Sequence, residues 1–375
     1  MTPARSEAQL VDVIVKDILK KLESVTISTD SDGLVGLNSR VEQIKSLLCI
    51  GLPVFRIVGI WGMGGIGKTT IAGAIFNQIS RVFEGKCFVA NVREESEKEG
   101  VLVRLRERIL SEILDENIKI RTPNLSECIK KRLRQMDVFI VLDDVNKVGQ
   151  LDYLAGGLDQ FGPGSKIIVT TRDKRVLDNF GVSNIYKVNG LENHEAFKLF
   201  CYYAFKGNHG PEDLLVLSER VLYYANGNPL ALRVLGSFRH QKNKLDWEIA
   251  LENLKLICDP DIYDVLKVSY NELKAEEKSM FLDIACFFEG EDKDYVTMSQ
   301  DDPNFAYYVL NVLVDKSLVT ISCFNKLQMH DLLQEMGQEI VRQESIKQAA
   351  NRSRLWYHKD IYHVLKKNKV RSYTI

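Results

Sequence analysis

Short continuous runs of apolar residues recur between residues 54 and 188 and alternate with stretches of helical spacing. The runs are FRIVGI (55–60), CFVANV (87–92), VFIVLDD (138–144), KIIVTTR (166–172) and IYKV (185–188). Strands that are buried on both faces have this composition, because helices cover both sides of a parallel sheet. The helical pattern LVRLRERILSEIL (102–114) between two of the runs indicates parallel pairing. We therefore expect an α/β domain with a doubly wound parallel sheet over residues 35–190.

The rest of the chain is dominated by helical spacing. The pattern predicts helices over 193–205, 212–224, 229–240 and 245–257, which would form an α-helical bundle over residues 191–260. Further helices are expected over 262–271, 275–288, 304–315 and 331–343, with a β-hairpin around CFN (323–325). This order predicts a winged-helix domain over residues 261–345. An amphipathic pattern over 8–23 predicts a helix and a linker within residues 1–34, and residues 346–375 are expected to form a C-terminal tail.

Composition and charge narrow the class of protein. The chain has a formal net charge of −1, 45% hydrophobic residues and 27% charged residues, so it has no global basic field for nucleic acid or anionic lipid. Seven scattered cysteines without a C-x-x-C pair indicate neither a disulfide framework nor a zinc site. No signal-peptide pattern and no long apolar run is present. We expect a cytoplasmic or nucleo-cytoplasmic protein that contacts no membrane.

The first candidate site follows the first predicted strand. The pattern Gly62-x-x-x-x-Gly67-Lys68-Thr69 fits a phosphate-binding loop, in which backbone N–H groups surround phosphates, the lysine reaches outer oxygens and the hydroxyl holds Mg²⁺. A strand before the loop and a helical pattern after it supply the context that the motif requires. The alternative is an ordinary Gly-rich turn. The residues expected to hold the phosphates are Gly62, Met63, Gly64, Gly65, Ile66, Gly67, Lys68, Thr69 and Thr70.

Two further strands end in charged residues. VFIVLDDV (138–145) ends in Asp143 and Asp144, and open α/β sheets bind ligands at the carboxyl ends of their strands. We expect Asp143 to hold Mg²⁺ together with Thr69, and Asp144 to orient or polarise an attacking water as the catalytic residue. The alternative is a solvated Asp-Asp turn. Arg172 ends KIIVTTR (166–172), where its guanidinium can fork onto terminal phosphate oxygens or form a surface salt bridge.

Seven sequence blocks stand in an order that resembles one known family. The blocks are GMGGIGKTT (62–70), FEGKCFVANVRE (83–94), VLDDVNKVGQLDYL (141–154), GSKIIVTTRDKRVL (164–177), GNPLALRVLG (227–236), FLDIACFFEGEDKDYV (281–296) and MHDLLQEMG (329–337). Together they resemble the NB-ARC module of plant intracellular immune receptors, the nucleotide-binding leucine-rich-repeat class. Asn146 after LDDV, and the block FLDIACFF, are typical of the subclass that carries a Toll/interleukin-receptor (TIR) domain.

This resemblance implies a molecular switch that is closed with ADP, open and oligomeric with ATP, and slow in hydrolysis. It also implies that Val35 and Gly36 contact the base through backbone groups, and that Pro229 and Leu230 line the adenine pocket. His330 would touch the β-phosphate of ADP. The implied partners are an adenine nucleotide with Mg²⁺, TIR and leucine-rich-repeat (LRR) domains or other immune receptors in cis or in trans, and further copies of the chain.

Structural alternatives and other functions remain open at this level. The resemblance makes Arg172 a sensor of the γ-phosphate, whereas His330 stands at a predicted helix start, where it could act as a cap. A P-loop kinase and a winged-helix DNA-binding regulator are the competing functions, although neither an Arg-rich lid nor a basic reading helix is evident. No TIR domain precedes residue 8 and no LRR pattern follows residue 368. We therefore expect a fragment, a truncated product or a short receptor.

Overall fold

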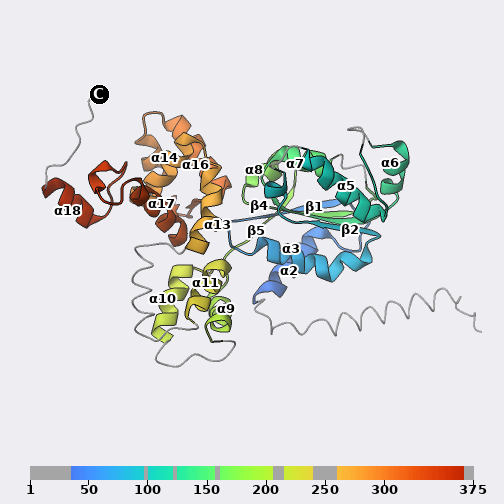
Figure 1. The fold of residues 1–375 in the computed structure, drawn as a ribbon, viewed down its shortest axis with the longest axis horizontal. Helices are drawn as coiled ribbons and strands as arrows, with labels where there is room; N and C mark the ends of the chain where they lie inside the picture. Colours follow the sequence, from blue (N-terminus) through green and yellow to red (C-terminus); the bar gives the residue numbers. More distant parts are fainter. Residues whose placement is uncertain are drawn as a thin grey trace, which may run out of the picture.

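The computed structural model describes residues 35–96, 100–120, 125–156, 161–205, 215–239 and 260–366. The amphipathic pattern at 8–23 and the helix expected over 245–257 lie outside these residues. In Figure 1 the sheet and the helices around it occupy one side of the molecule, and the remaining helices occupy the other. No helix in the described ranges combines the length and the hydropathy that a bilayer crossing needs.

A five-stranded parallel sheet forms the first half of the structure, as the apolar runs predict. Its strands are β1 (Arg56–Trp61), β2 (Gly85–Val89), β3 (Val138–Val145), β4 (Lys166–Thr171) and β5 (Asn184–Lys187). Their order across the sheet is β2-β3-β4-β1-β5, and each neighbouring pair is parallel. Because all five strands run in the same direction, the residues that follow β1, β2, β3 and β4 meet at one edge of the sheet.

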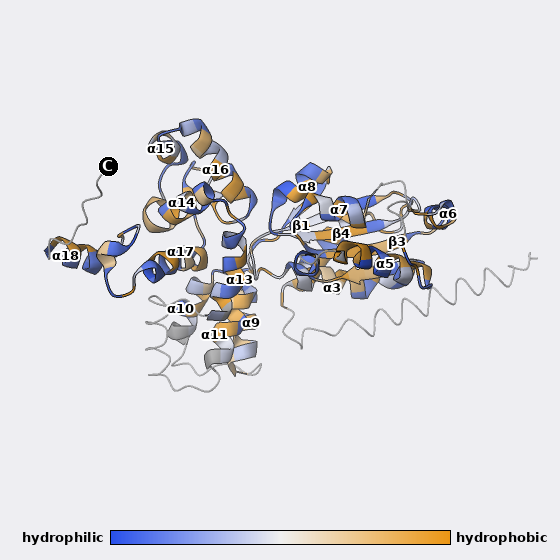
Figure 2. Cartoon of the chain, turned by 45° about the horizontal axis from the view of Figure 1, so that its top comes forward, coloured by the Kyte–Doolittle hydropathy of each residue, from blue (hydrophilic) through white to orange (hydrophobic). Residues whose placement is uncertain are grey.

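Helices cover both faces of the sheet, because successive strand residues point to opposite sides. The covering helices are α2 (Leu37–Leu48), α3 (Lys68–Ile79), α5 (Val101–Leu114), α7 (Val148–Leu154) and α8 (Lys174–Phe180). Ile168 in β4 belongs to a buried cluster with α2 and α3, whereas its neighbour Ile167 belongs to the cluster with α5, α7 and α8. Figure 2 shows hydrophobic residues gathered in β3 and β4 and on the adjoining α3. The doubly wound architecture is confirmed.

The second half of the structure is helical and shares one hydrophobic core. Its helices are α9 (Asn193–Phe205), α10 (Leu215–Ala225), α11 (Pro229–Arg239), α13 (Pro260–Asn271), α14 (Ala275–Asp283), α15 (Lys293–Met298), α16 (Pro303–Asp315), α17 (Asp331–Glu344) and α18 (His358–Lys366). The antiparallel strands β6 (Thr320–Ile321) and β7 (Leu327–Gln328) lie between α16 and α17. One buried cluster runs from Phe200 in α9 to Met336 in α17. The expected bundle and the expected winged helix therefore pack on a common core.

Local features differ from the sequence expectation at three places. The run CFVANV is a strand only as far as Val89, because Asn91 adopts a left-handed φ of 51°, and Val92 then begins the short helix α4 (Val92–Glu95). The helix expected over 275–288 is α14 followed by a π-helical turn (Ile284–Phe288). The expected tail contains α18. The remaining elements are the 3-10 turns η1 (Ser80–Val82) and η4 (Ala349–Asn351) and the helix α6 (Glu127–Arg134).

Candidate functional site

A cavity of about 390 Å³ lies at the carboxyl edge of the sheet, between the start of α3 and helices α9 and α11. This volume is within the usual range for small-molecule sites. The predicted nucleotide residues that line it are Val35, Gly36, Gly65, Ile66, Gly67, Lys68, Thr69, Thr70, Asp144, Arg172, Pro229 and Leu230. The predicted residues that do not line it are Gly62, Met63, Gly64, Asp143 and His330. Most of the predicted set is therefore gathered around one cavity.

The phosphate-binding loop has the backbone that its glycines allow. Gly65 and Gly67 have φ values of 75° and 97°, a region that favours glycine because it carries no Cβ. The Nζ of Lys68 donates hydrogen bonds to the carbonyl oxygens of Gly62 at 2.8 Å and Met63 at 2.9 Å. Burial, followed by the charge of Arg172, lowers the pKa of Lys68 to about 7. The side chain of Lys68 is thus buried against neutral carbonyl groups, which favour its charged form less than phosphate oxygens would.

Oxygen ligands for a divalent cation lie beside the start of α3. The hydroxyl of Thr69 donates to the two carboxylate oxygens of Asp143 at 2.9 and 3.1 Å, and the hydroxyl of Thr170 donates to Asp143 Oδ1 at 2.6 Å. Asp143 is fully buried, whereas Thr69 lines the cavity. Hydroxyl and carboxylate oxygens are the ligands that Mg²⁺ prefers. The residues predicted to hold Mg²⁺ are therefore adjacent and chemically suited to it.

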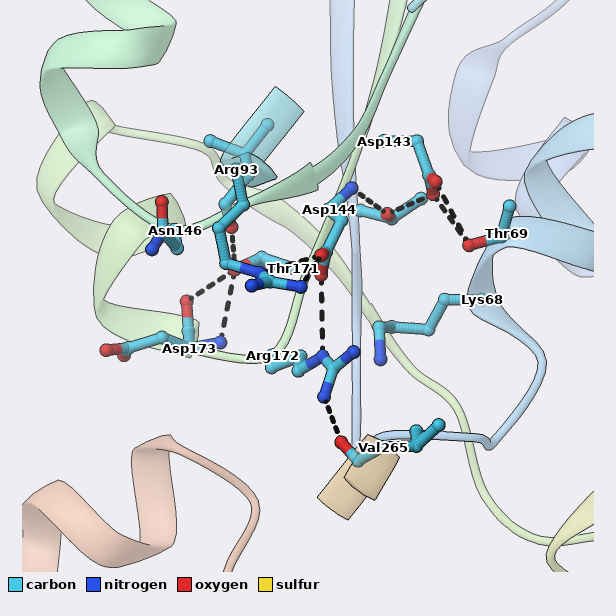
Figure 3. Close-up of polar contacts among 12 residues, drawn as sticks. Lys68, Thr69, Arg93, Asp143, Asp144, Asn146, Thr171, Arg172, Asp173 and Val265 are labelled. Carbon is cyan, nitrogen blue, oxygen red and sulfur yellow. Dashed lines mark hydrogen bonds and ion pairs between the residues drawn. The ribbon is translucent and has the colours of Figure 1, made fainter. Parts of the chain in front are cut away.

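Asp144 lies between two arginines at the same edge of the sheet (Figure 3). The Nε of Arg93 donates to Asp144 Oδ2 at 2.9 Å, and Arg93 Nη2 lies 2.8 Å from the same oxygen. The Nε of Arg172 lies 3.4 Å from Asp144 Oδ1. Asp144 has a left-handed φ of 55°, which directs its side chain away from that of Asp143. Sequence reasoning missed Arg93, although it follows the carboxyl end of β2 and that position was a usable signal.

Helix α11 braces the phosphate-binding loop from the opposite side. The Nδ2 of Asn228 donates to the Gly64 carbonyl at 3.3 Å, and its Oδ1 accepts from the N–H of Leu230 at 3.0 Å. The N–H of Leu230 also donates to the Gly65 carbonyl at 3.3 Å. The amide of Asn228 is buried, and both its nitrogen and its oxygen take part in this contact. The start of α11 and the loop therefore form one hydrogen-bonded wall of the cavity.

The end of the cavity between α2, α9 and α11 is built by residues that no motif singled out. Arg40 in α2 forms an ion pair with Glu195 in α9 at 3.1 Å and donates to the Gly190 carbonyl at 3.1 Å. A further hydrogen bond from Arg40 reaches the carbonyl of Gly36. This network fixes the Val35–Gly36 backbone against α9. The lining residues missed by sequence reasoning are Leu37, Arg40, Ile71, Asn91, Arg93, Glu94, Thr170, Leu191, Leu199, Tyr203 and Arg233.

His330 caps helix α17 and is buried. Its Nδ1 accepts a hydrogen bond from the N–H of Leu332 at 3.3 Å, which is the capping geometry that the sequence left open. Its Nε2 is buried and forms no hydrogen bond of full geometry in the described part of the chain, although the backbone of Asn226 lies close enough to raise its pKa in part. Burial lowers the pKa of His330 to about 4, so the imidazole is neutral at physiological pH.

Polar contacts join the carboxyl edge of the sheet to the distal helices. Arg172 Nη1 donates to the carbonyl of Val265 in α13 at 2.7 Å. Trp61 Nε1 donates to the carbonyl of Asp315 in α16 at 2.9 Å. Lys316 Nζ lies 3.1 Å from Asp173 Oδ2 in a pair whose side chains are each 9% exposed. The residue that faces the cavity, Arg172, therefore also touches the second half of the molecule.

Comparison with known proteins assigns both halves of the chain. The family model for the NB-ARC domain matches residues 37–210, the region that holds the sheet and the cavity. This part of the chain belongs to the NB-ARC family. The model for the winged-helix domain of Roq1-like disease resistance proteins matches residues 274–345. The predicted α/β P-loop NTPase fold, followed by helices and a winged-helix domain, is confirmed, and so is the family resemblance.

Relatives of this NB-ARC chain include plant disease-resistance proteins. It is 42% identical over 373 residues to TMV resistance protein N of Nicotiana glutinosa, covering 97% of this chain and 32% of that protein. It is 41% identical over 355 residues to disease resistance protein RUN1 of Vitis rotundifolia, covering 93% and 26%. The chain thus spans about a third or less of the length of these relatives. A Walker-type ATPase of Pyrococcus abyssi has the same fold, with a TM-score of 0.59 at 14% identity over 80% of this chain and 95% of that one.

Proposed function

We propose that this NB-ARC chain is the nucleotide switch of a plant innate immune receptor. ADP holds a closed resting state, exchange for ATP gives an open state that oligomerises and signals, and slow hydrolysis restores the resting state. Because the chain spans about a third or less of its relatives, the proposed partners are TIR and LRR domains or other immune receptors, in cis or in trans. The proposed location is the cytoplasm, or the nucleus and the cytoplasm together.

The charge of the cavity supports an anionic ligand. Five of the residues that line it are arginine or lysine and two are acidic. Glu195 neutralises Arg40 at the base end, whereas Lys68 and Arg172 stand together at the loop end (Figure 3). Phosphate groups favour a site that combines backbone N–H groups with such cations. The loop end of the cavity therefore suits the phosphates, and the apolar end between α2, α9 and α11 suits the base.

The observation that carries the proposal is that Arg172 faces the cavity and also contacts helix α13. Its side chain lines the cavity, yet its Nη1 donates to the Val265 carbonyl in α13 at 2.7 Å. A terminal phosphate bound above the loop would compete with Val265 for this guanidinium. The identity of the nucleotide would then bias the packing of the sheet against α13, since a ligand shifts a conformational equilibrium by its differential affinity for the two states.

A few such contacts can supply the difference in binding free energy that the switch requires. Moving a two-state equilibrium from 1:99 to 99:1 takes about 5.5 kcal/mol of differential binding. Hydrogen bonds to charged groups contribute about 1.5–3 kcal/mol each, so roughly two to four contacts that differ between ADP and ATP would suffice. Arg172 supplies one or two of them. A further residue that distinguishes the two nucleotides would supply the remaining contacts.

The other predicted residues take their roles in the same proposal. Thr69 and Asp143 would hold Mg²⁺, which offsets phosphate charge when bound, and Asp144 would orient the attacking water. Val35, Gly36, Pro229 and Leu230 would surround the base. His330 would reach the β-phosphate of ADP from the winged helix. The Nε2 of His330 forms no hydrogen bond of full geometry and so offers a donor for this last role, although His330 does not line the cavity.

The winged helix supplies no reason to propose nucleic acid as a partner. Helix α16, which precedes the β-hairpin, exposes Phe305, Tyr307 and Tyr308, which are each about half exposed. Aromatic groups do not neutralise backbone phosphates, and sequence-independent binding depends on lysine and arginine. Five arginine and lysine residues instead line the cavity at the edge of the sheet.

Calorimetric titration with ADP and with ATPγS tests the proposal directly. Wild type and Lys130→Ala, a change at an exposed ion pair in α6, should bind both nucleotides, and Lys68→Ala should bind neither. Sedimentation velocity then tests the switch. The ATPγS complex should sediment as a larger species than the ADP complex, whereas identical sedimentation at all protein concentrations would contradict a nucleotide-dependent assembly.

A further inference from the structure

Arg93 is a buried cation at the nucleotide cavity that no motif predicts. It follows β2 in the short helix α4, and its side chain is 11% exposed. Both its Nε and its Nη2 contact Oδ2 of Asp144, which is 14% exposed. Its other charged contact is Glu94, which is 63% exposed. The ion pair of Arg93 and Asp144 is therefore better shielded from water than an ordinary surface salt bridge.

The strand order brings four charged side chains together. Neighbouring strands β2, β3 and β4 deliver Arg93, Asp144 and Arg172 in that order, and β1 leads into the loop that carries Lys68. All four side chains line the cavity. Figure 3 shows Asp144 between the two guanidinium groups, with Lys68 on the side of Arg172. The carboxylate therefore holds two arginines at the place where the loop directs the outer phosphates.

We propose that Arg93 is a second ligand for the terminal phosphate, and that Asp144 binds Arg93 and Arg172 until that phosphate is present. This inference rests on the proposed function, and it adds a second residue, besides Arg172, that distinguishes ATP from ADP. A guanidinium that leaves a carboxylate for a phosphate keeps a charged partner, and the Asp144 carboxylate that it leaves becomes available to water. Binding of ATP would thus replace carboxylate contacts with phosphate contacts at two arginines together.

The same geometry accounts for slow hydrolysis. Each oxygen of Asp144 is used by a different arginine, Oδ2 by Arg93 and Oδ1 by Arg172. A general base or a water-positioning carboxylate needs an oxygen within hydrogen-bond reach of the water. While both arginines remain on Asp144, they compete with water for its carboxylate oxygens and weaken its basicity. Asp144 is therefore a better acceptor for water after the guanidinium groups have moved to the phosphate.

The test is the ratio of ATPγS affinity to ADP affinity, measured by calorimetry on the full chain. Arg93→Ala should weaken ATPγS binding about tenfold or more, because a charge-assisted hydrogen bond is lost, and should change ADP binding less than about threefold. Arg93→Lys should give an intermediate loss, since it keeps the charge without the planar fork. The matched control is Arg132→Ala in α6, which removes an exposed ion pair between Arg132 and Glu116.

A double-mutant cycle with Asp144→Asn separates phosphate contact from neutralisation of Asp144. If Arg93 binds phosphate, Arg93→Ala should still reduce ATPγS affinity about tenfold in the Asp144→Asn background. If Arg93 only neutralises Asp144, that background should remove the loss, and the proposal would be overturned. Equal losses for ADP and ATPγS, or no loss for either, would overturn it as well. Arg93→Gln, which keeps the aliphatic part of the side chain and a polar end, replaces Arg93→Ala should the alanine variant fail to fold.

The failure of this inference is distinguishable from failure of the proposed function. Should Arg93→Ala leave both affinities unchanged while Lys68→Ala abolishes binding, the nucleotide site stands and Arg93 has no part in it. Should wild type bind neither ADP nor ATPγS, the nucleotide site itself is refuted. The two results need only the same titrations on three proteins.

Discussion

The buried lysine of the phosphate-binding loop should make nucleotide binding depend on pH. The pKa of Lys68 is lowered to about 7 from an ordinary value of 10.5, first by burial and then by Arg172. Its two hydrogen-bond acceptors are the neutral carbonyls of Gly62 and Met63, which offset only part of the cost of burying the charge. Phosphate oxygens would bring negative charge to Nζ. The pKa must therefore rise when nucleotide binds, and binding takes up a proton at pH values above about 7.

The size of the effect follows from the protonated fraction. With a pKa of about 7, half of the Lys68 side chains are protonated at pH 7 and only about 1% at pH 9. If the ammonium form is the one that binds phosphates, affinity for ADP should fall about fiftyfold between pH 7 and pH 9. The sign is fixed, because raising the pH removes the proton that the complex needs. A group at the ordinary lysine pKa would give almost no change over this range.

Calorimetry at several pH values, in two buffers of different ionisation enthalpy, measures both the affinity and the protons taken up. Lys68→Arg is the matched variant, because a guanidinium stays charged throughout the range, and any titration of the phosphates themselves appears equally in both proteins. Wild type should lose affinity steeply and the variant should not. A flat profile in wild type, or equal slopes in the two proteins, would refute the reasoning about Lys68.

Three further changes test other parts of the structure. Burial lowers the pKa of His330 from its ordinary value of 6.5 to about 4 in the folded chain. About 3 kcal/mol of stability that is present above pH 6.5 should therefore be lost as the pH falls from 6.5 through 4. The variant His330→Asn keeps a capping side chain and should lack this loss in acid denaturation. Gly65→Ala places a Cβ 2.8 Å from that of Leu230, at a residue whose φ is +75°. This variant should bind ADP about tenfold or more weakly. Unchanged affinity would show that the loop can shift to accommodate the methyl group. Lys316→Met removes one partner of buried Asp173 but leaves its contact to Arg175. Urea denaturation should therefore show that the free energy of unfolding falls by about 1–3 kcal/mol. No loss would mean that the Lys316–Asp173 ion pair does not stabilise the fold.

Patterns within one segment predicted the sheet and half of the site. The phosphate-binding loop was predictable because its glycines, Lys68 and Thr69 are fixed by local geometry, and Asp143, Asp144 and Arg172 because each ends a recognisable apolar strand. The same rule applied to the end of the second strand, β2, would have found Arg93. It did not, since CFVANV reads as a strand up to Val92, whereas the left-handed Asn91 ends the strand early and begins α4.

The remaining parts of the site depend on packing between distant segments, which no local pattern reports. The pair of Arg40 and Glu195 joins residues that are 155 positions apart, and Arg172 meets the Val265 carbonyl 93 positions away. Neither partner has a distinctive neighbourhood in sequence. The cap formed by His330 was predictable from its place at a helix start, but its burial was not, because burial depends on how α17 packs beside α10.

The most direct test of the account is the adenine nucleotide content of the purified chain, measured by mass spectrometry after denaturation. Wild type and Lys130→Ala should each release about one ADP per chain, and Lys68→Ala should release almost none, because the loop motif places its lysine on the phosphates. A wild-type chain that carries no nucleotide and binds none when it is supplied would contradict the central claim, as would a Lys68→Ala chain that retains ADP undiminished.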